Sequence, residues 1–220
     1  MSPNGSITSP KSGATRVAEH HLAKEDLAIR FVNTAAWRLR SDVEERLPSP
    51  QALLDWFRAN DLISHGERTA LQRAWKFDVE AANSLYDNAI ALRELIYNLL
   101  IARIGVQTPR TKDLEAFNDF LTADGVGGAT LAWRAGGYGW RATKGMASLL
   151  TPITLSAAEL LTGIRSGKVR QCQDDRGCGW LFVDESRAQN RRWCSMGDCG
   201  NRAKAHRHYR RAKGHAVKSD

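Results

Sequence analysis

All four cysteines of this 220-residue chain lie in its last quarter, with the spacing C-x5-C-x15-C-x4-C. They are Cys172, Cys178, Cys194 and Cys199. Two close pairs joined by a loop of this length can present four thiolates to one ion, as in a tetrahedral structural zinc site. Because four thiolates fill every coordination position, a catalytic zinc with an open position is not expected. We therefore predict one structural Zn²⁺ ion bound by these residues.

Two other interpretations of the cysteines are weaker. Disulfide bonds suit secreted proteins, whereas the sequence MSPNGSITSPKSGATRVAEHH at the N-terminus lacks the apolar region of a secretory signal. His206 and His208 are alternative ligands, but four cysteines already complete the site. No apolar run approaches the roughly 20 residues that span a bilayer. We expect a cytoplasmic protein, nucleoid-associated if bacterial, with no membrane partner.

A basic segment surrounds and follows the cysteines. Residues 165–220 contain 14 Lys and Arg and 6 Asp and Glu, so they hold the whole formal charge of +8. The run GNRAKAHRHYRRAKG contains no helix breaker before Gly214 and predicts a basic helix. Concentrated positive charge of this kind attracts a polyanion. The predicted nucleic-acid contacts are Arg191, Arg192, Arg202, Lys204, Arg207, His208, Arg210, Arg211 and Lys213.

Duplex DNA is the expected polyanion. Lys and Arg on a helix neutralise phosphates, and Arg can also hydrogen-bond to guanine edges in a major groove. Single-stranded RNA is an alternative, because Tyr209 or the tryptophans between the cysteines could stack on bases. A basic helix that is merely solvated is the third interpretation.

The predicted finger, residues 166–220, consists of a β-hairpin and the basic helix. We expect its strands in GWLFVDES, residues 179–186, and RRWCS, residues 191–195. A small core around the metal is predicted from three aromatic residues, Trp180, Phe182 and Trp193.

The sequence before the finger predicts an α+β fold. We expect a flexible lead at residues 1–21, followed by a mostly helical domain with a few strands at residues 22–165. Helical periodicity is strongest in SLYDNAIALRELIYNLLIARIGV. LAIRFVNT, residues 27–34, favours a strand, and TLAWRAGGYGWRAT, residues 130–143, a hairpin. Helix starts are indicated at Ser49-Pro50, Ser64-x-x-Glu67, Thr111 and Ser156-x-x-Glu159.

The function of the large domain has few sequence signals. Asn33, Thr34 and Arg93 are speculative ligand contacts, although a turn cap for the first two and a solvated helix stripe for Arg93 are also open. No G-x-S-x-G, H-E-x-x-H, P-loop or G-x-G-x-x-G pattern is present, so we do not expect an enzyme. An enzyme with a pocket around Asn33 is nevertheless an alternative.

The string CGWLFVDESRAQNRRWCSMGDCGNRAKAHRHYRR resembles the CGNR zinc-finger family, named for the run Cys199-Gly200-Asn201-Arg202. In that family the finger typically follows an ABATE domain, and FVNT, LPSPQALLDWFRANDLIS, LRELIYNLL and AAELLTG resemble that domain. The resemblance implies zinc binding, DNA binding and stress-linked transcription regulation. The large domain would then sense a small effector or form a homodimer. The first cysteine pair has one residue more than the family pattern, which Gly177 could absorb.

Overall fold

The computed structural model describes residues 26–122, 130–134, 137–141 and 149–216. The predicted flexible lead at residues 1–21 lies outside these ranges. Within them, the N-terminal region is mostly helical and has a few short antiparallel strands, and the cysteines follow it, so the predicted fold class is confirmed.

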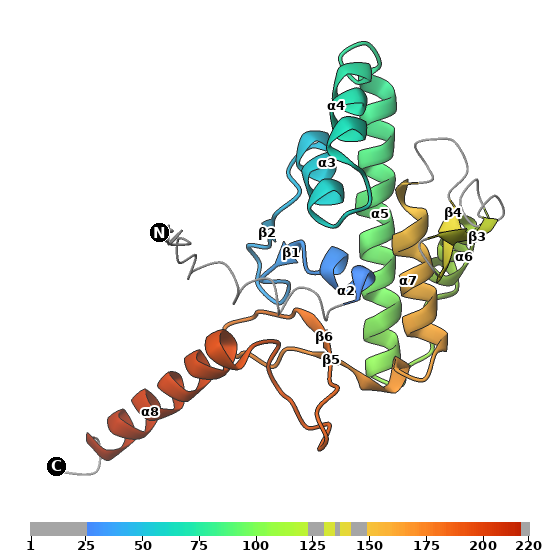
Figure 1. The fold of residues 1–220 in the computed structure, drawn as a ribbon. Helices are drawn as coiled ribbons and strands as arrows, with labels where there is room; N and C mark the ends of the chain where they lie inside the picture. The colour runs from blue at the N-terminus through green and yellow to red at the C-terminus, as the bar shows by residue number, and fades with distance from the viewer. Residues whose placement is uncertain (1–25, 123–129, 135–136, 142–148, 217–220) are drawn as a thin grey trace, which may run out of the picture.

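Helix α5 (Val79–Ile104) is the central element of the helical region, and other helices pack on either side of it (Figure 1). Its apolar positions face a core in which Leu92, Ile96 and Leu100 are fully buried. The helices around α5 are α2 (Leu27–Val32), α3 (Pro50–Ala59), α4 (His65–Ala74), α6 (Thr111–Thr122) and α7 (Thr151–Thr162). None of the helices in the described ranges combines the length and the apolar character of a membrane-crossing segment.

The predicted starts of α3 and α4 are confirmed at atomic level. The hydroxyl of Ser49 accepts a hydrogen bond from the backbone N–H of Ala52, directly ahead of Pro50 in the first turn. Ser64 and Glu67 form a reciprocal capping box, in which each side chain accepts from the backbone N–H of the other residue. Thr111 is the first residue of α6.

Residues 27–34 do not form the predicted strand. They contain helix α2, whose buried side chains are Ala28, Ile29, Phe31 and Val32. These apolar residues stand at positions i, i+1, i+3 and i+4, which is the spacing of a helix and not the strict alternation of a strand. Helix α2 packs against α5 and α7, and its four apolar side chains are buried.

The predicted capping box at Ser156 is also wrong. Helix α7 begins five residues earlier, at Thr151, with Pro152 in its first turn and with Ile153 buried before the serine. Ser156 lies inside the helix, and its hydroxyl accepts a hydrogen bond of 3.1 Å from the backbone N–H of Ala28. Gly163 is the C-cap of α7.

The described strands form three separate antiparallel pairs. β1 (Ala35–Ala36) pairs with β2 (Glu44–Glu45), and β3 (Thr130–Arg134) pairs with β4 (Gly137–Arg141), which is the hairpin expected there. In the finger, β5 (Val169–Gln171) pairs with β6 (Leu181–Val183).

The finger hairpin therefore differs from the prediction. β6 lies within the first expected strand, but its partner β5 precedes the first cysteine, and RRWCS is not a strand. The carboxylate of Asp184 accepts hydrogen bonds from Ser186 and from the backbone N–H of Arg191, which holds the connecting segment as a loop instead.

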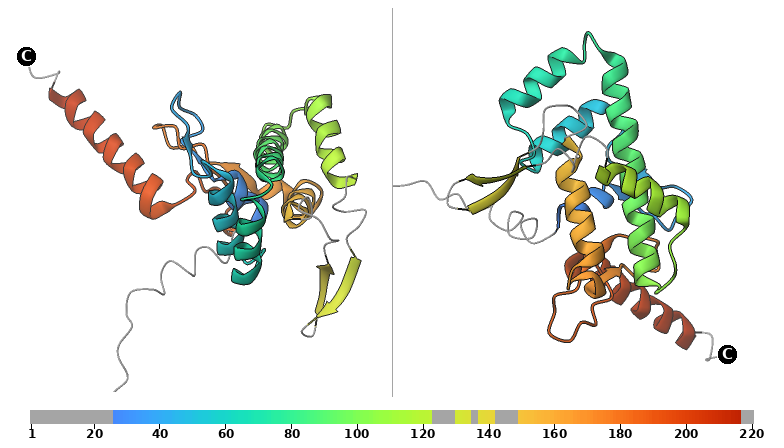
Figure 2. Two further views of the ribbon diagram at one scale, coloured as in Figure 1. Left: turned by 90° about the horizontal axis from the view of Figure 1, so that it is seen from above. Right: turned by 90° about the vertical axis from the view of Figure 1, so that its right-hand side faces the viewer.

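The basic helix is confirmed. A π-helical turn, Met196–Gly200, leads into α8 (Asn201–Ala216), which continues through Gly214. Helix α8 projects away from the rest of the molecule in all three views (Figures 1 and 2).

Candidate metal centre and nucleic-acid interface

The four cysteines converge on one point. Their Sγ atoms all lie within 4.8 Å of one another. The Sγ of Cys194 lies 3.9 Å from that of Cys178 and 3.6 Å from that of Cys199. A tetrahedral zinc ion with Zn–S bonds of about 2.3 Å requires sulfur atoms about 3.8 Å apart. The four cysteines are therefore able to bind one zinc ion, as predicted.

Each ligand comes from a different local structure. Cys172 follows strand β5, and Cys178 precedes β6. Cys194 lies in the loop after β6, and Cys199 lies in the π-helical turn before α8. The segment from Cys172 to Cys178, here called the first knuckle, also contains Gly177 with a φ of 89°, a left-handed conformation that favours glycine. This conformation accommodates the extra residue noted in the sequence.

The thiols of the cluster shift one another's pKa. Hydrogen bonds from Cys178 and Cys194 lower the pKa of the Cys172 thiol, and the same interactions raise the pKa of both donors. Burial raises the pKa of Cys199. The four thiols therefore influence one another's ionisation, as closely packed titratable groups do. A bound divalent cation overrides this influence, because coordinated thiols are deprotonated.

Arg202 places a fixed positive charge beside the cysteines. Its Nη2 donates hydrogen bonds to Sγ of Cys199 at 2.8 Å and to Oδ2 of Asp174 at 3.0 Å, and Nη1 pairs with Asp198. The Asp174 side chain is completely buried. We predicted Arg202 as a nucleic-acid contact, but in the structure its guanidinium is engaged within the finger.

The aromatic core of the finger is confirmed and has one additional member. Phe182 is buried with the cysteines, and Trp180 and Trp193 pack against them. Trp37, from the N-terminal region, packs against the same cluster. Trp37 is not among the residues predicted from the sequence, since its neighbours carry no local signal for a metal site.

The other predicted nucleic-acid contacts fall into distinct groups. Arg191 is engaged within the finger, because its Nη2 donates a hydrogen bond of 2.8 Å to the backbone oxygen of Cys194. Arg192 and Arg207 are exposed, and their guanidinium carbons lie 5.5 Å and 5.9 Å from the ring centroid of Trp193. Lys204 is exposed. The remaining predicted contacts are residues of helix α8: His208, Arg210, Arg211 and Lys213.

His206 does not join the metal cluster. Its Nδ1 lies 2.5 Å from Oδ2 of Asp175, in the first knuckle. This contact attaches the second turn of α8 to the first knuckle. The metal cluster found among the described residues consists of the four cysteines alone.

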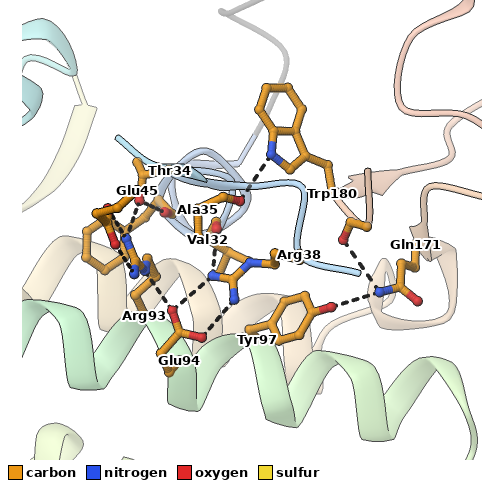
Figure 3. A network of polar contacts seen from close by, with 12 residues as sticks. Val32, Thr34, Ala35, Arg38, Glu45, Arg93, Glu94, Tyr97, Gln171 and Trp180 are labelled. Carbon is orange, nitrogen blue, oxygen red and sulfur yellow. Dashed lines mark hydrogen bonds and ion pairs between the residues drawn. The ribbon is translucent and has the colours of Figure 1, made fainter. Parts of the chain in front are cut away.

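The three speculative ligand contacts make intramolecular hydrogen bonds. The Asn33 amide donates to the backbone oxygen of Leu181 at 2.9 Å and accepts from its N–H at 3.0 Å. The Thr34 hydroxyl accepts from Arg93, which also binds both carboxylate oxygens of Glu45 (Figure 3). Arg93 is only 4% exposed, so its interpretation as part of a solvated stripe is wrong. Ligand binding by these residues stays a prediction.

The fold and the site define a class: a mostly helical domain followed by a four-cysteine zinc finger with a projecting basic helix. The family model of ABATE, described as "Putative stress-induced transcription regulator", matches residues 25–164, and the CGNR zinc-finger model matches residues 168–212. The chain therefore belongs to the ABATE family and carries a CGNR zinc finger, in the order that the sequence resemblance predicted. A comparison with curated proteins finds no match.

Proposed function

We propose that this protein is a zinc-dependent transcription regulator that binds duplex DNA through helix α8 and the adjacent loop. The observation that carries the proposal is the projection of α8 from the cysteine cluster (Figure 1). The helix contains no Asp or Glu, and Lys204 and Arg207 are exposed on it. A helix of 16 residues is about 24 Å long, and a helix fits the major groove. The family description, a transcription regulator, is consistent with this role.

Duplex DNA is favoured over single-stranded RNA by the surroundings of the tryptophans. Recognition of single strands depends on aromatic rings on which bases can stack. Guanidinium groups of the same chain already lie against these rings: Arg40 is 3.9 Å from the centroid of Trp37, and Arg46 is 4.8 Å from that of Trp180. Cation–π contacts of this kind compete with base stacking.

The proposal is tested with the full-length, zinc-loaded protein and a pool of fluorescent genomic duplexes of about 25 base pairs. We expect affinity to fall steeply with salt, because Lys and Arg release counterions when they neutralise phosphates. Lys204→Ala and Arg207→Ala should each weaken binding and reduce the salt slope by about one unit if the residue contacts a phosphate. Arg58→Ala removes the same charge from an exposed position of α3 and is the matched control.

Two results would contradict the proposal. One is the absence of salt-sensitive binding to any duplex in the pool. The other is tighter binding to single-stranded RNA of equal length, which would support the RNA alternative.

For the helical domain we propose the sensing of a small effector or self-association. A pocket of about 260 Å³ between α5 and α6 is a candidate effector site. The acid in its lining, Asp113, forms an ion pair of 2.8 Å with Arg110, so no contact in this pocket specifically favours an enzyme. A cytoplasmic location also suits the proposal, because no disulfide joins the four cysteines and reducing compartments keep cysteines available as metal ligands.

A further inference from the structure

We propose that residues Trp37–Arg40 of the N-terminal region, here called the docking segment, complete the zinc site and slow the loss of its metal. The docking segment lies outside residues 168–212, which the CGNR zinc-finger model matches. The inference depends on zinc binding by the four cysteines but not on DNA binding. Trp37 and Arg38 are its positioning residues.

The backbone of the first knuckle is held by three successive residues of the docking segment. The N–H of Arg38 donates to the backbone oxygen of Cys178 at 3.1 Å, and the N–H of Leu39 donates to that of Gly177 at 3.1 Å. Nε of Arg40 donates to the backbone oxygen of Arg176 at 2.6 Å. Three neighbouring carbonyls of the knuckle thus point to donors from a region more than a hundred residues away in sequence.

The close approach of these two segments requires glycine at Gly177 in the knuckle and at Gly179 directly after it. A Cβ atom on Gly177 would lie 2.9 Å from Cγ of Arg40, and one on Gly179 would lie 2.9 Å from Cγ of Leu39. Both glycines also have positive φ angles, which side chains rarely tolerate. The first knuckle is therefore shaped to receive the docking segment.

The Trp37 side chain packs against the cysteine cluster. Its ring packs against the group formed by Cys172, Cys178 and Cys199 with Phe182. The Arg202 guanidinium lies 5.2 Å from the Trp37 ring centroid while donating a hydrogen bond to Cys199. Trp37 thus packs against the cluster that contains the cysteines and lies beside the guanidinium that hydrogen-bonds to one of them. The backbone of Trp37 adopts a φ of 58°, an uncommon conformation for a bulky residue, which its packing must hold.

Arg38 attaches the docking segment to helix α5 (Figure 3). Its guanidinium donates to the Glu94 carboxylate at 2.7 Å and 3.1 Å and to the backbone oxygen of Val32 at 3.0 Å. The guanidinium also lies 4.1 Å from the ring centroid of Tyr97, and the side chain is 6% exposed. The position of Cys178 is therefore connected to α5 through one buried side chain and one backbone hydrogen bond.

Groups around a metal site that orient its ligands influence affinity strongly, and changes to them typically cost 10- to 100-fold. The docking segment meets this description, since it hydrogen-bonds to the backbone of Cys178 and packs against the cysteine cluster through Trp37. We therefore expect its loss to accelerate dissociation of zinc while the four ligands remain in place.

The experiment measures the rate at which full-length, zinc-loaded protein releases metal to an excess of a chromogenic chelator. Trp37→Ala should release zinc 10- to 100-fold faster than wild type. Glu94→Gln, which weakens the anchor of Arg38, should release it several-fold faster. The controls are Phe77→Ala, at a 92% exposed position, and Glu115→Gln, on the exposed side of α6, and both should stay within twofold of wild type.

A second measurement decides the question without a variant, in case Trp37→Ala does not fold. Hydrogen–deuterium exchange of the wild type should show faster exchange of the Arg38 and Leu39 amides after chelation of zinc, because their acceptors are in the first knuckle. Unchanged exchange at these amides would overturn the inference. So would release rates within twofold of wild type in a folded Trp37→Ala protein. Neither measurement involves DNA, so failure here is distinct from failure of the proposed function.

Discussion

Nη2 of Arg202 lies 2.8 Å from Sγ of Cys199, three residues before it, and binds the buried carboxylate of Asp174 at the same time. Cys199 is therefore not only a metal ligand. It is also the point at which the positive charge of helix α8 meets the cysteine cluster, so the last residue of the CGNR run has a structural explanation in this chain.

Replacing Arg202 with alanine should weaken zinc binding by about tenfold, because Cys199 loses a charge-assisted donor and Asp174 loses its buried partner. The measurement is competition for zinc against a chelator of known affinity. Arg202→Lys should restore only part of the affinity, because an ammonium group cannot reproduce the forked geometry. Arg207→Ala is the control on the same helix. Equal affinities for Arg202→Ala and wild type would contradict the role assigned to Arg202.

Cys194→Ser should reduce the zinc content from one ion per chain to far below one, as measured by elemental analysis after dialysis. Zinc binding in structural sites is worth on the order of 10 kcal/mol, and a finger of this size has little other core. Most of the helical circular dichroism should remain, because the core of the helical region does not include the cysteines. Ser195→Ala, at the adjacent exposed residue, should retain the metal. Full zinc content in Cys194→Ser would rule out a four-cysteine site.

Asn33→Ala should destabilise the protein by about 1–3 kcal/mol, since it leaves the backbone N–H and oxygen of Leu181 without their partners. For a chain of this size, each kcal/mol corresponds to a fall in Tm of about 2–4 °C. Thermal unfolding followed by fluorescence measures the change. Asn118→Ala, at an exposed position of α6, should alter the free energy of unfolding by less than about 0.5 kcal/mol. An equally small effect of Asn33→Ala would show that these bonds contribute little.

The capping box predicts a local dependence on pH. Hydrogen bonds from the backbone and side chain of Ser64 lower the pKa of Glu67 from its ordinary value of 4.5. A lowered pKa contributes stability that is complete above pH 4.5 and is lost as pH falls through the folded value. The difference in Tm between wild type and Glu67→Ala should therefore be constant from pH 7 to about pH 5 and shrink below pH 4.5. A difference that grows on acidification would contradict the capping geometry.

Local signals in the sequence predicted the parts of the molecule that depend on neighbouring residues. The serine caps of α3 and α4 follow from spacings of three residues, and the zinc site follows from cysteine spacing that the fold closes into a cluster. The hairpin of β3 and β4 follows from the same kind of local pattern.

The predictions that were wrong depend on tertiary contacts, which the spacing of residues in the sequence does not indicate. The segment of α2 has too few residues to separate a helical period from alternation, and tertiary packing decided its conformation. Strand β6 pairs with β5 and not with the predicted strand RRWCS. The residues after β6 form a loop in which Asp184 accepts a hydrogen bond from the backbone N–H of Arg191. Asn33 and Leu181 bind each other across 148 positions, so the role of Asn33 could not be read from either segment.

The described contacts of helix α8 with the rest of the finger include those of Arg202, His206 and Arg207, which lie in its first two turns. A rod about 24 Å long that turns by about 10° about its base moves its far end by about 4 Å, more than the rise of one DNA base pair. The base of α8, beside the four cysteines, is thus a pivot at which a small rotation produces a larger displacement of the far end of the helix. In the proposed complex with duplex DNA, a small rotation at the first knuckle would therefore change which phosphates the far end of α8 can reach.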